Sequence, residues 1–431
     1  MDILFKNCRM LLPDGDGFRA EDGYLGVRGK SIDYVGKAKP EAAYAAEKDM
    51  TGKILMPGLV NAHTHAAMTL LRGKGTGLPL QNWLFDCIFP IEERMTPQDM
   101  RVGSELAMLE MLACGTVSFT DMYMFPRETA EAVLAAGMKA NLCRPVQSFD
   151  ETEDPRQNRM IAESLALYDE FHGAGEGRVL VDFSIHAEYT CTAPAVRYYA
   201  QQCQARGGNL HIHLAETEKE TQACIARYGM TPAAWFDSLG AFDGDVFAAH
   251  CVTLSERDTA LLREKNVKIV HNPSSNMKLG SGFAPVRRYL DAGITVGLGT
   301  DGASSNNDLD MFEEMHLASL IHNGRAQDAL LIRPRDVLAM ATAAGAAIQR
   351  RPDTGRLAVG MRADIAAVDT DAPHLTPDLD TEALLVYAAK GADVCMTMVD
   401  GEILYENGTY KTLDRERIMA EAKAAARRLH G

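Results

Sequence analysis

Along the middle of the chain, short runs of apolar residues alternate with longer segments in which apolar residues recur every three or four positions. Such alternation of strands and amphipathic helices is typical of parallel β/α packing. Eight apolar runs are spaced in this way, at residues 58–65, 115–123, 139–146, 178–187, 208–216, 245–252, 267–275 and 294–302. Eight strand–helix units predict an α/β fold of the (β/α)8 TIM barrel type.

The two ends of the chain show a different pattern. Residues 1–56, 355–369 and 394–408 contain short apolar stretches broken by Gly, Pro and Asp, and Asp400-Gly401 and Asn407-Gly408 are typical hairpin turns. We therefore expect the two ends to form one small β-sandwich beside the barrel. Residues 1–56 would give its first part, 57–355 the barrel, and 356–431 its second part with a terminal helix over 413–429.

Composition narrows the possible partners. The chain has 431 residues, with 44 Lys and Arg against 59 Asp and Glu, and its net charge of -15 argues against binding nucleic acid or anionic lipid. Its nine cysteines form no Cys-x-x-Cys pair, which is typical of reduced thiols. Because no apolar stretch reaches the ~18 residues of a membrane helix, we expect a cytoplasmic protein with no membrane partner.

Histidines stand at the ends of two predicted strands with the same spacing. His63 and His65 end the first run, and on a strand, residues i and i+2 point to the same face. The two histidines could therefore form half of a metal site. The alternative is that they are only a pair of hydrogen-bonded polar residues at the mouth of the barrel. In the fifth run we expect only one of His211 and His213 to face the centre. Glu216 lies just beyond His213, so we predict His213 as a ligand and give His211 an outer-layer or second-shell role.

Two further polar residues end other strands. His250 ends the sixth run and Asp301 the eighth, at the rim where barrel active sites lie. A His-rich site with one carboxylate suits Zn²⁺ or a similar divalent ion, which would lower the pKa of a water from ~15.7 toward ~7. Glu216 would then shuttle protons, while His250 and Asp301 would orient the water and take up its proton.

Other polar residues receive weaker expectations. Asp121 and Asp182 are expected to cap or pack, and His271 either lines the site or is structural. The fourth run, 178–187, carries no inward lysine that could bridge two metals. This favours a single metal ion.

Four motifs, "PGLVNAHTH", "HIHLAE", "AHCV" and "GTDG", together with the β segments at both ends, resemble the amidohydrolase superfamily over nearly the whole chain. The resemblance implies a mononuclear deaminase site whose ligands are His63, His65, His213 and Asp301. It implies that His250 contacts the attacking water and substrate, although in some relatives this histidine binds the metal. Zn²⁺ is the expected ion, with Fe²⁺ as an alternative.

Within that superfamily, "NWLFDCIFPIEER", "CRPV" and "IHAEYTC" look most like the 5'-methylthioadenosine/S-adenosylhomocysteine deaminases. The resemblance implies four substrate contacts beside His213 and Glu216: Trp83 near the adenosine, Glu92 on the ribose hydroxyls, Arg144 near the sugar or its 5' substituent, and His186. Arg156 or Arg159 would add a second cation near the 5' group.

The resulting expectation is a metal-dependent deaminase that converts adenosine-type nucleosides to inosine derivatives and ammonia, acting on a small-molecule substrate as a homo-oligomer. The 5' group stays open among methylthioadenosine, adenosylhomocysteine, 5'-deoxyadenosine and adenosine. A guanine or cytosine deaminase, or a chlorotriazine-type hydrolase, would share the fold. A catalytically dead scaffold is the alternative from another class.

Overall fold

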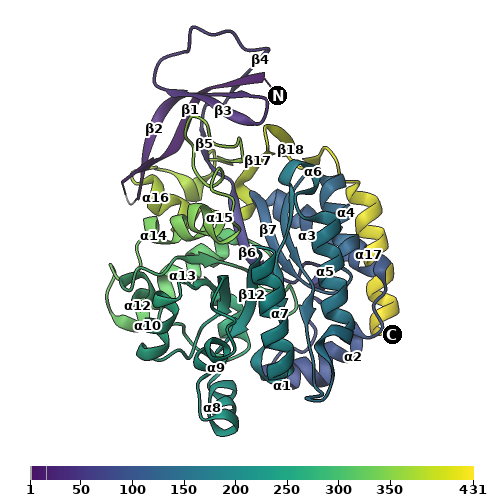
Figure 1. Cartoon of the computed structure of the whole chain (residues 1–431). Helices are drawn as coiled ribbons and strands as arrows, with labels where there is room; N and C mark the ends of the chain where they lie inside the picture. The colour runs from purple at the N-terminus through teal and green to yellow at the C-terminus, as the bar shows by residue number, and fades with distance from the viewer. Residues whose placement is uncertain (1, 16) are drawn as a thin grey trace.

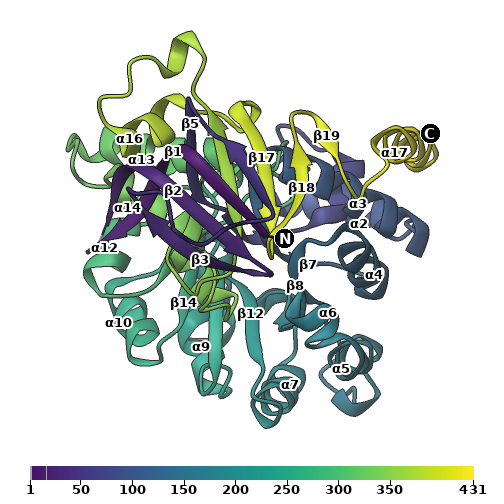
Figure 2. The same cartoon turned by 90° about the horizontal axis from the view of Figure 1, so that it is seen from above.

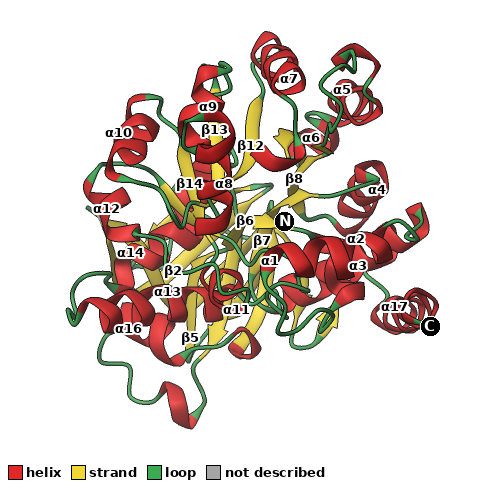
Figure 3. Ribbon diagram, turned by 90° about the horizontal axis from the view of Figure 1, so that it is seen from below, coloured by secondary structure: helices red, strands yellow, loops and turns green. Residues whose placement is uncertain are grey.

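The structure is a computed structural model that describes residues 2–15 and 17–431. Its centre is a ring of parallel strands surrounded by helices (Figure 3). The strands are β6 (Leu59–Thr64), β7 (Thr116–Met122), β8 (Lys139–Cys143), β9 (Pro145–Val146), β10 (Val179–Val181), β11 (Phe183–Ile185), β12 (Asn209–Leu214), β13 (Asp245–His250), β14 (Lys268–His271) and β15 (Val296–Leu298). Every predicted barrel strand is therefore present.

Two of the predicted strands are interrupted by one residue each. Arg144 separates β8 from β9, and Asp182 separates β10 from β11, so the pairing runs as a four-stranded sheet, β10-β8-β7-β6, and a six-stranded sheet, β15-β14-β13-β12-β11-β9. At the seam between β15 and β6, the N–H of Asp301 donates to the carbonyl of His63 at 3.0 Å. The predicted α/β barrel fold is confirmed. The hydrogen-bonded strand pairing is not continuous around the barrel.

The helices that cover the strands begin and end where the sequence provides caps. Thr96 and Asp99 form a capping box at the start of α3, and α4 ends at Gly137, whose φ of 79° suits a left-handed C-cap. The longer covering helices are α3 (Pro97–Ala113), α4 (Pro126–Ala136), α5 (Arg159–Phe171), α7 (Ala193–Ala205), α8 (Glu218–Tyr228), α10 (Glu256–Glu264) and α13 (Met311–Ala326).

Shorter helices fill the connections. They are α1 (Leu80–Asn82), α2 (Phe89–Glu92), α6 (Ala174–Gly177), α9 (Pro232–Ser238), α11 (Pro273–Lys278), α12 (Val286–Asp291), α14 (Pro334–Ala339), α15 (Gly345–Ile348) and α16 (Thr381–Ala383). A π-helical turn, Trp83–Ile88, joins α1 to α2. Because π-helical turns occur often at functional sites, this segment is a candidate wall of the site.

The two ends of the chain meet in one nine-stranded sheet, shown from above in Figure 2. Its strands are β1 (Asp2–Asp14), β2 (Gly17–Arg28), β3 (Ser31–Gly36), β4 (Ala46–Asp49), β5 (Lys53–Pro57), β16 (Ile365–Asp369), β17 (Val394–Val399), β18 (Glu402–Glu406) and β19 (Thr409–Tyr410). The predicted pairing of the ends is confirmed where β5 runs antiparallel to β16. The chain then passes from β5 directly into β6 of the barrel (Figure 1).

The details at the C-terminal end agree with the sequence in part. The turns at Asp400-Gly401 and Asn407-Gly408 are present with positive φ at all four residues. The terminal helix is α17 (Arg415–His430). Of residues 355–369, only β16 is a strand. The domain boundaries after residues 56 and 355 stay predictions. Within the described part of the chain, no helix has the length and apolar character needed to cross a membrane.

Candidate active site

The carboxyl ends of β6, β12, β13 and β15 bring buried histidines and one carboxylate together. The Nε2 atoms of His63 and His65 lie 3.3 and 3.2 Å from Oδ1 of Asp301. Ligand atoms of His63, His65 and His213 lie within 4.8 Å of one another, and so do those of His63, His250 and Asp301. At this spacing, side chains from several strands could bind one metal ion together.

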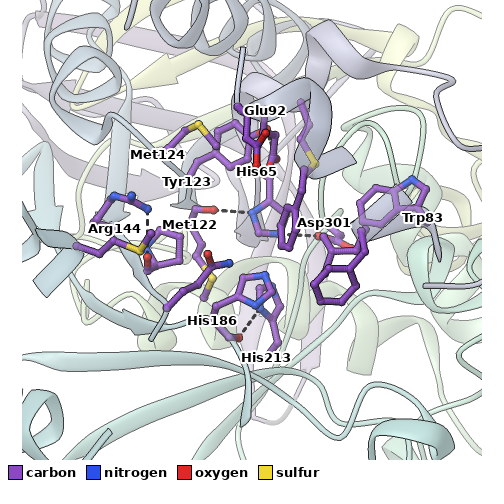
Figure 4. Close-up of a pocket in the computed structure, with 18 of the residues that line it drawn as sticks. His65, Trp83, Glu92, Met122, Tyr123, Met124, Arg144, His186, His213 and Asp301 are labelled. Atoms are coloured by element: carbon purple, nitrogen blue, oxygen red, sulfur yellow. Dashed lines mark hydrogen bonds and ion pairs between the residues drawn. The ribbon is translucent and has the colours of Figure 1, made fainter. Parts of the chain in front are cut away.

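The hydrogen bonds of the histidines determine which nitrogen is free. Nδ1 of His65 donates to the carbonyl of Met122 at 2.6 Å, and Nδ1 of His213 donates to the carbonyl of His186 at 2.7 Å (Figure 4). Because a carbonyl can only accept, both Nδ1 atoms carry a proton, which leaves Nε2 as the ring nitrogen that can turn to a cation. Nε2 of His63 is buried and lies 3.3 Å from Oδ1 of Asp301. Several buried imidazole nitrogens gathered around one carboxylate oxygen fit a cation.

Asp301 is oriented by two serines. Its Oδ2 accepts hydrogen bonds from Oγ of Ser275 at 2.6 Å and Oγ of Ser305 at 2.8 Å, which leaves Oδ1 directed at the histidines. Burial by itself would raise the pKa of Asp301, but the imidazoles of His63 and His65 hold that pKa well below its usual value. Asp301 is therefore an ionised carboxylate with one oxygen available to a cation.

Unusual backbone angles gather at the same strand ends. Ala215, His250, Cys251 and Asp301 have φ of 49°, 72°, 49° and 60°, in the left-handed region that side-chain-bearing residues rarely adopt. Such conformations persist only where the surroundings impose them, and they cluster at functional sites. The chain maintains this strain at the ends of β12, β13 and β15.

A cavity of about 610 Å³ opens above these residues. It is lined by nine of the side chains predicted from the sequence: His65, Trp83, Glu92, Arg144, His186, His213, Glu216, His250 and Asp301. In Figure 4, Arg144 and Trp83 flank the group formed by His65, His213 and Asp301. His63 lies beneath the floor and is fully buried. The structure thus places all of the predicted site residues in or under one cavity.

Glu216 and His250 face each other at the floor of the cavity. Oε2 of Glu216 lies 3.8 Å from Nε2 of His250, and Oε1 is 3.4 Å from the hydroxyl of Ser281. Burial raises the pKa of Glu216 above its usual value. On its other side, Nδ1 of His250 lies 2.9 Å from Oδ1 of Asn276. A buried carboxyl group with a raised pKa is suited to holding and releasing a proton.

On another wall, Glu92 has one oxygen engaged and one free. Its Oε1 accepts the hydroxyl of Tyr123 at 2.5 Å, and burial raises the pKa of Glu92. Trp83 is 5% exposed and also lines the cavity. His186 donates or accepts through Nδ1 at 3.1 Å from Oγ1 of Thr190, and burial lowers its pKa to about 3, so its ring is neutral.

Arginines reach the same cavity from the break between β8 and β9 and from α5. Nε of Arg144 lies 2.9 Å from Oε2 of Glu163, and Nε of Arg159 lies 2.8 Å from Oε1 of the same carboxylate. Both arginines and Glu163 line the cavity. Arg156 instead pairs with Asp154 and is not among the lining residues. Of the two arginines that the resemblance left open, Arg159 is the one at the cavity.

The expectation that only one histidine of the β12 pair faces the centre is wrong. His211 also points into the barrel, one layer deeper, because strand residues i and i+2 share a face. Its Nε2 lies 3.0 Å from Nδ1 of His63, and its ring stacks on Phe247 with centroids 4.2 Å apart. It contacts a candidate ligand and does not line the cavity, which agrees with the place behind the ligands assigned to it from the sequence.

The remaining polar residues with weaker expectations are structural in their contacts. Asp121 accepts the N–H of Ala66 at 2.7 Å, and Asp182 accepts the amide of Asn141 at 2.9 Å. His271 lies 3.1 Å from His322, ring nitrogen to ring nitrogen, and does not line the cavity.

Several side chains that shape the site carry no assignment from the sequence. They are Tyr123, Glu163, Ser275, Asn276, Ser281 and Ser305. A usable signal was present for two of them, because "HNPSSN" is a dense polar run directly after a barrel strand. Tyr123 directly follows β7, at the end of the predicted run 115–123, and Glu163 lies on the outer helix α5, where the apolar pattern gives no sign of a contact with the site.

Comparison with known proteins places the chain in a class. Residues 54–404 match the amidohydrolase family, and the chain belongs to this family. The predicted resemblance to amidohydrolases is confirmed.

Individual relatives are similar over their full length. The chain is 43% identical to a 5-methylthioadenosine/S-adenosylhomocysteine deaminase of Pelotomaculum thermopropionicum, over 99% of each chain. It is 42% identical to a 5'-deoxyadenosine deaminase of Methanosarcina mazei, over 99% of this chain and 98% of the relative.

Two solved structures have nearly the same fold. An adenosine deaminase from Xanthomonas campestris with bound zinc superposes with a TM-score of 0.93 at 30% identity, covering 100% of this chain and 98% of the other. The zinc complex of atrazine chlorohydrolase from Arthrobacter aurescens gives a TM-score of 0.91 at 25% identity, covering 98% of this chain and 100% of the other.

Proposed function

We propose that this chain is a metal-dependent hydrolytic deaminase that converts adenosine-type nucleosides to inosine derivatives and ammonia. The observation that carries the proposal is the single cavity in which a histidine–aspartate cluster, a buried glutamic acid and a second carboxylate with a free oxygen lie together. Relatives at about 40% identity that are named deaminases of such nucleosides support it. The homo-oligomer expected from the sequence stays a prediction.

The donor set suits one divalent ion, and Zn²⁺ is the ion we propose, with Fe²⁺ as the alternative. His63, His65 and His213 offer imidazole nitrogens and Asp301 a carboxylate oxygen, which are ligand types that zinc accepts. His250 lies near enough to contact the reacting water or the ion. When bound, such an ion makes water a nucleophile near neutral pH.

Glu216 is the proposed proton carrier. The amino group of a purine leaves poorly as an anion, so it must receive a proton, and the ring nitrogen beside the reacting carbon must also be protonated. The carboxyl group of Glu216 is buried, holds a proton readily because its pKa is raised, and faces His250 across 3.8 Å. His250 and Asp301 would orient the attacking water.

The other lining residues suit a nucleoside. Glu92 has one oxygen held by Tyr123, so its other oxygen is available to accept ribose hydroxyls. Trp83 provides a flat apolar surface for the base. Arg144 and Arg159 supply cations at the end where a 5' substituent would extend, and neutral His186 can hydrogen-bond the substrate.

A panel assay with zinc-loaded protein tests the proposal. Adenosine, 5'-deoxyadenosine, 5'-methylthioadenosine and S-adenosylhomocysteine are each followed for ammonia and for the inosine product, beside guanine, cytosine and a chlorotriazine. We expect ammonia and inosine derivative in equal amounts from at least one nucleoside. Turnover of guanine, cytosine or the chlorotriazine alone would contradict the proposed substrate class. If no compound in the panel is turned over, a non-catalytic scaffold is favoured.

The matched control for this assay is Glu216→Gln. Glutamine keeps the shape of the side chain but cannot carry the proton, so the variant should keep its metal and lose ~10²–10⁴-fold in kcat. A variant with the wild-type rate would remove Glu216 from the reaction.

A further inference from the structure

The turn that presents Glu216 to the cavity is strained and held from two sides. Ala215, between β12 and Glu216, has φ of 49°. Its carbonyl accepts the N–H groups of Val252 and Thr253, each at 3.0 Å, and Oγ1 of Thr253 at 3.1 Å. These bonds tie one side of the turn to the loop that follows β13.

The other side of the turn is held by one carboxylate, that of Glu220 on the first turn of α8. Its Oε1 accepts the N–H of Ala215 at 2.9 Å. Its Oε2 accepts the N–H of Glu216 at 2.8 Å and the N–H of Thr217 at 3.4 Å. Glu220 is 3% exposed, so these bonds are shielded from water. Three successive N–H groups, centred on Glu216, thus converge on a single side chain.

This arrangement extends an ordinary helix cap. Thr217 and Glu220 form the capping box of α8, in which the acid normally reaches only the N–H of the capping residue. Here the acid also reaches the two residues before the cap, and one of them is the proposed proton carrier. The additional bonds are not needed to begin a helix.

We propose that Glu220 is a positioning residue for catalysis, which holds the backbone at Ala215 and Glu216 so that the carboxyl group of Glu216 points at the reacting atoms. The assignment rests on the proposed function, because it takes Glu216 to be the proton carrier. Without Glu220, two buried N–H groups lose their acceptor, and the strained angle at Ala215 is held only from the side of Val252 and Thr253. A shift of about 1 Å in a catalytic group can cost ~10²-fold in rate.

The chain contains a matched control in the capping box of α10. There Asp258 accepts the N–H of Ser255 at 3.0 Å, and Ser255 accepts the N–H of Asp258 at 3.1 Å. Asp258 is 4% exposed, almost the same as Glu220, but neither Ser255 nor Asp258 lines the cavity. Asp258→Asn therefore damages a comparable cap without touching Glu216.

The experiment compares Glu220→Gln with Asp258→Asn in zinc-loaded, full-length protein. Glutamine has the shape of glutamate but turns an amide N–H group toward backbone donors. Each variant is measured for Tm, zinc content, and kcat and KM on the best nucleoside of the panel and on its 6-chloro counterpart. Chloride leaves with its electron pair as water adds at the same carbon, so the leaving group needs no proton and Glu216 serves only the ring nitrogen.

For Glu220→Gln we expect kcat on the amino substrate to fall ~10²-fold, with KM and zinc content close to wild type. The loss on the 6-chloro substrate should be smaller, as it should be for Glu216→Gln. Asp258→Asn should lower Tm to a similar extent and change kcat less than ~2-fold. If Glu220→Gln does not fold, Glu220→Asp takes its place, because aspartate keeps the charge on a shorter side chain. Its loss of kcat is compared in the same way between the two substrates and with Asp258→Asn.

The inference is overturned if the loss for the Glu220 variant matches that of Asp258→Asn, or is equal for the two leaving groups, because either result means a purely structural cap. Its failure is distinct from failure of the proposed function. In the first case the wild-type protein still deaminates a nucleoside, and in the second it deaminates none.

Discussion

The histidine pair on β6 and the histidine pair on β12 share the same spacing but differ in what they contact. Both members of the first pair, His63 and His65, reach Asp301 through Nε2. In the second pair, His213 lines the cavity, whereas His211 stacks on Phe247 and lies 3.0 Å from His63.

The difference comes from position along the strand. β6 ends at Thr64 and β12 ends at Leu214, so His63 and His213 both occupy the position before the last strand residue. His65 lies just past the end of its strand, while His211 lies two residues deeper than His213 in the barrel. At ~3.3 Å per residue, this depth is about 7 Å. Two residues on one face are therefore equivalent only if both are near the carboxyl end.

The strongest test of this comparison is His213→Asn. The substitution removes an imidazole whose Nε2 is directed at the other candidate ligands, so the metal site should be lost. We expect zinc content well below one ion per chain and activity reduced by roughly 10³-fold or more. Elemental analysis and the ammonia assay measure both, and full zinc occupancy in this variant would contradict the assignment.

His211→Asn makes the matching change one layer deeper. Because His211 orients His63 and does not reach the cavity, we expect the variant to bind zinc 10–100-fold more weakly, the range typical of residues behind a metal ligand. At saturating zinc, most of its activity should return. Behaviour identical to that of His213→Asn would mean that depth does not separate the two histidines.

A smaller effect is expected at Asp301, the carboxylate that contacts the first pair. Ser275→Ala removes one of the two hydroxyls that hold Oδ2 of Asp301, and a hydrogen bond to a charged group contributes about 1.5–3 kcal/mol. With Ser305 still in place, we expect about 10-fold weaker zinc binding. Ser304→Ala is the control, since the hydroxyl of Ser304 bonds to the carbonyl of Lys74 instead. Equal zinc affinity in the two variants would argue against the orienting role.

The smallest effect concerns Arg156 and Arg159. Like His211 and His213, they are close in the sequence, but only one of them lines the cavity. Arg159 lines the cavity and Arg156 does not. Arg159 is largely exposed, so its contribution to binding a charged 5' substituent is modest, about 0.2–1 kcal/mol. Arg159→Ala should raise KM for S-adenosylhomocysteine up to ~5-fold and leave 5'-deoxyadenosine unchanged. Arg156→Ala should change neither KM. If Arg156→Ala raised KM for S-adenosylhomocysteine and Arg159→Ala did not, Arg156 would be the residue that binds the 5' substituent.

Much of the fold and of the site follows from the sequence for a simple reason. In a parallel barrel the carboxyl ends of all strands meet on one face, so polar residues that end apolar runs must gather there. His63, His65, His213, His250 and Asp301 could be found in this way. Glu216 could be placed because it follows β12 by two residues.

Other features depend on depth and on loops, which the apolar pattern does not encode. Alternation along β12 gives a face but not a distance from the rim. The expectation that His211 faces away from the centre was wrong, whereas its assignment to a place behind the ligands agrees with its contact to His63. Tyr123 and Glu163 contribute through a loop and the outer helix α5, and their contacts exist only after the barrel has closed. Glu220 looks like an ordinary capping residue until its three hydrogen bonds are seen.

The most direct test of the account is a crystal of the zinc-soaked protein, with anomalous diffraction measured at the zinc edge. The account predicts one strong peak per chain, within bonding distance of Nε2 of His63, His65 and His213 and of Oδ1 of Asp301. The absence of a peak, or a peak bound by His211 in place of His213, would contradict it.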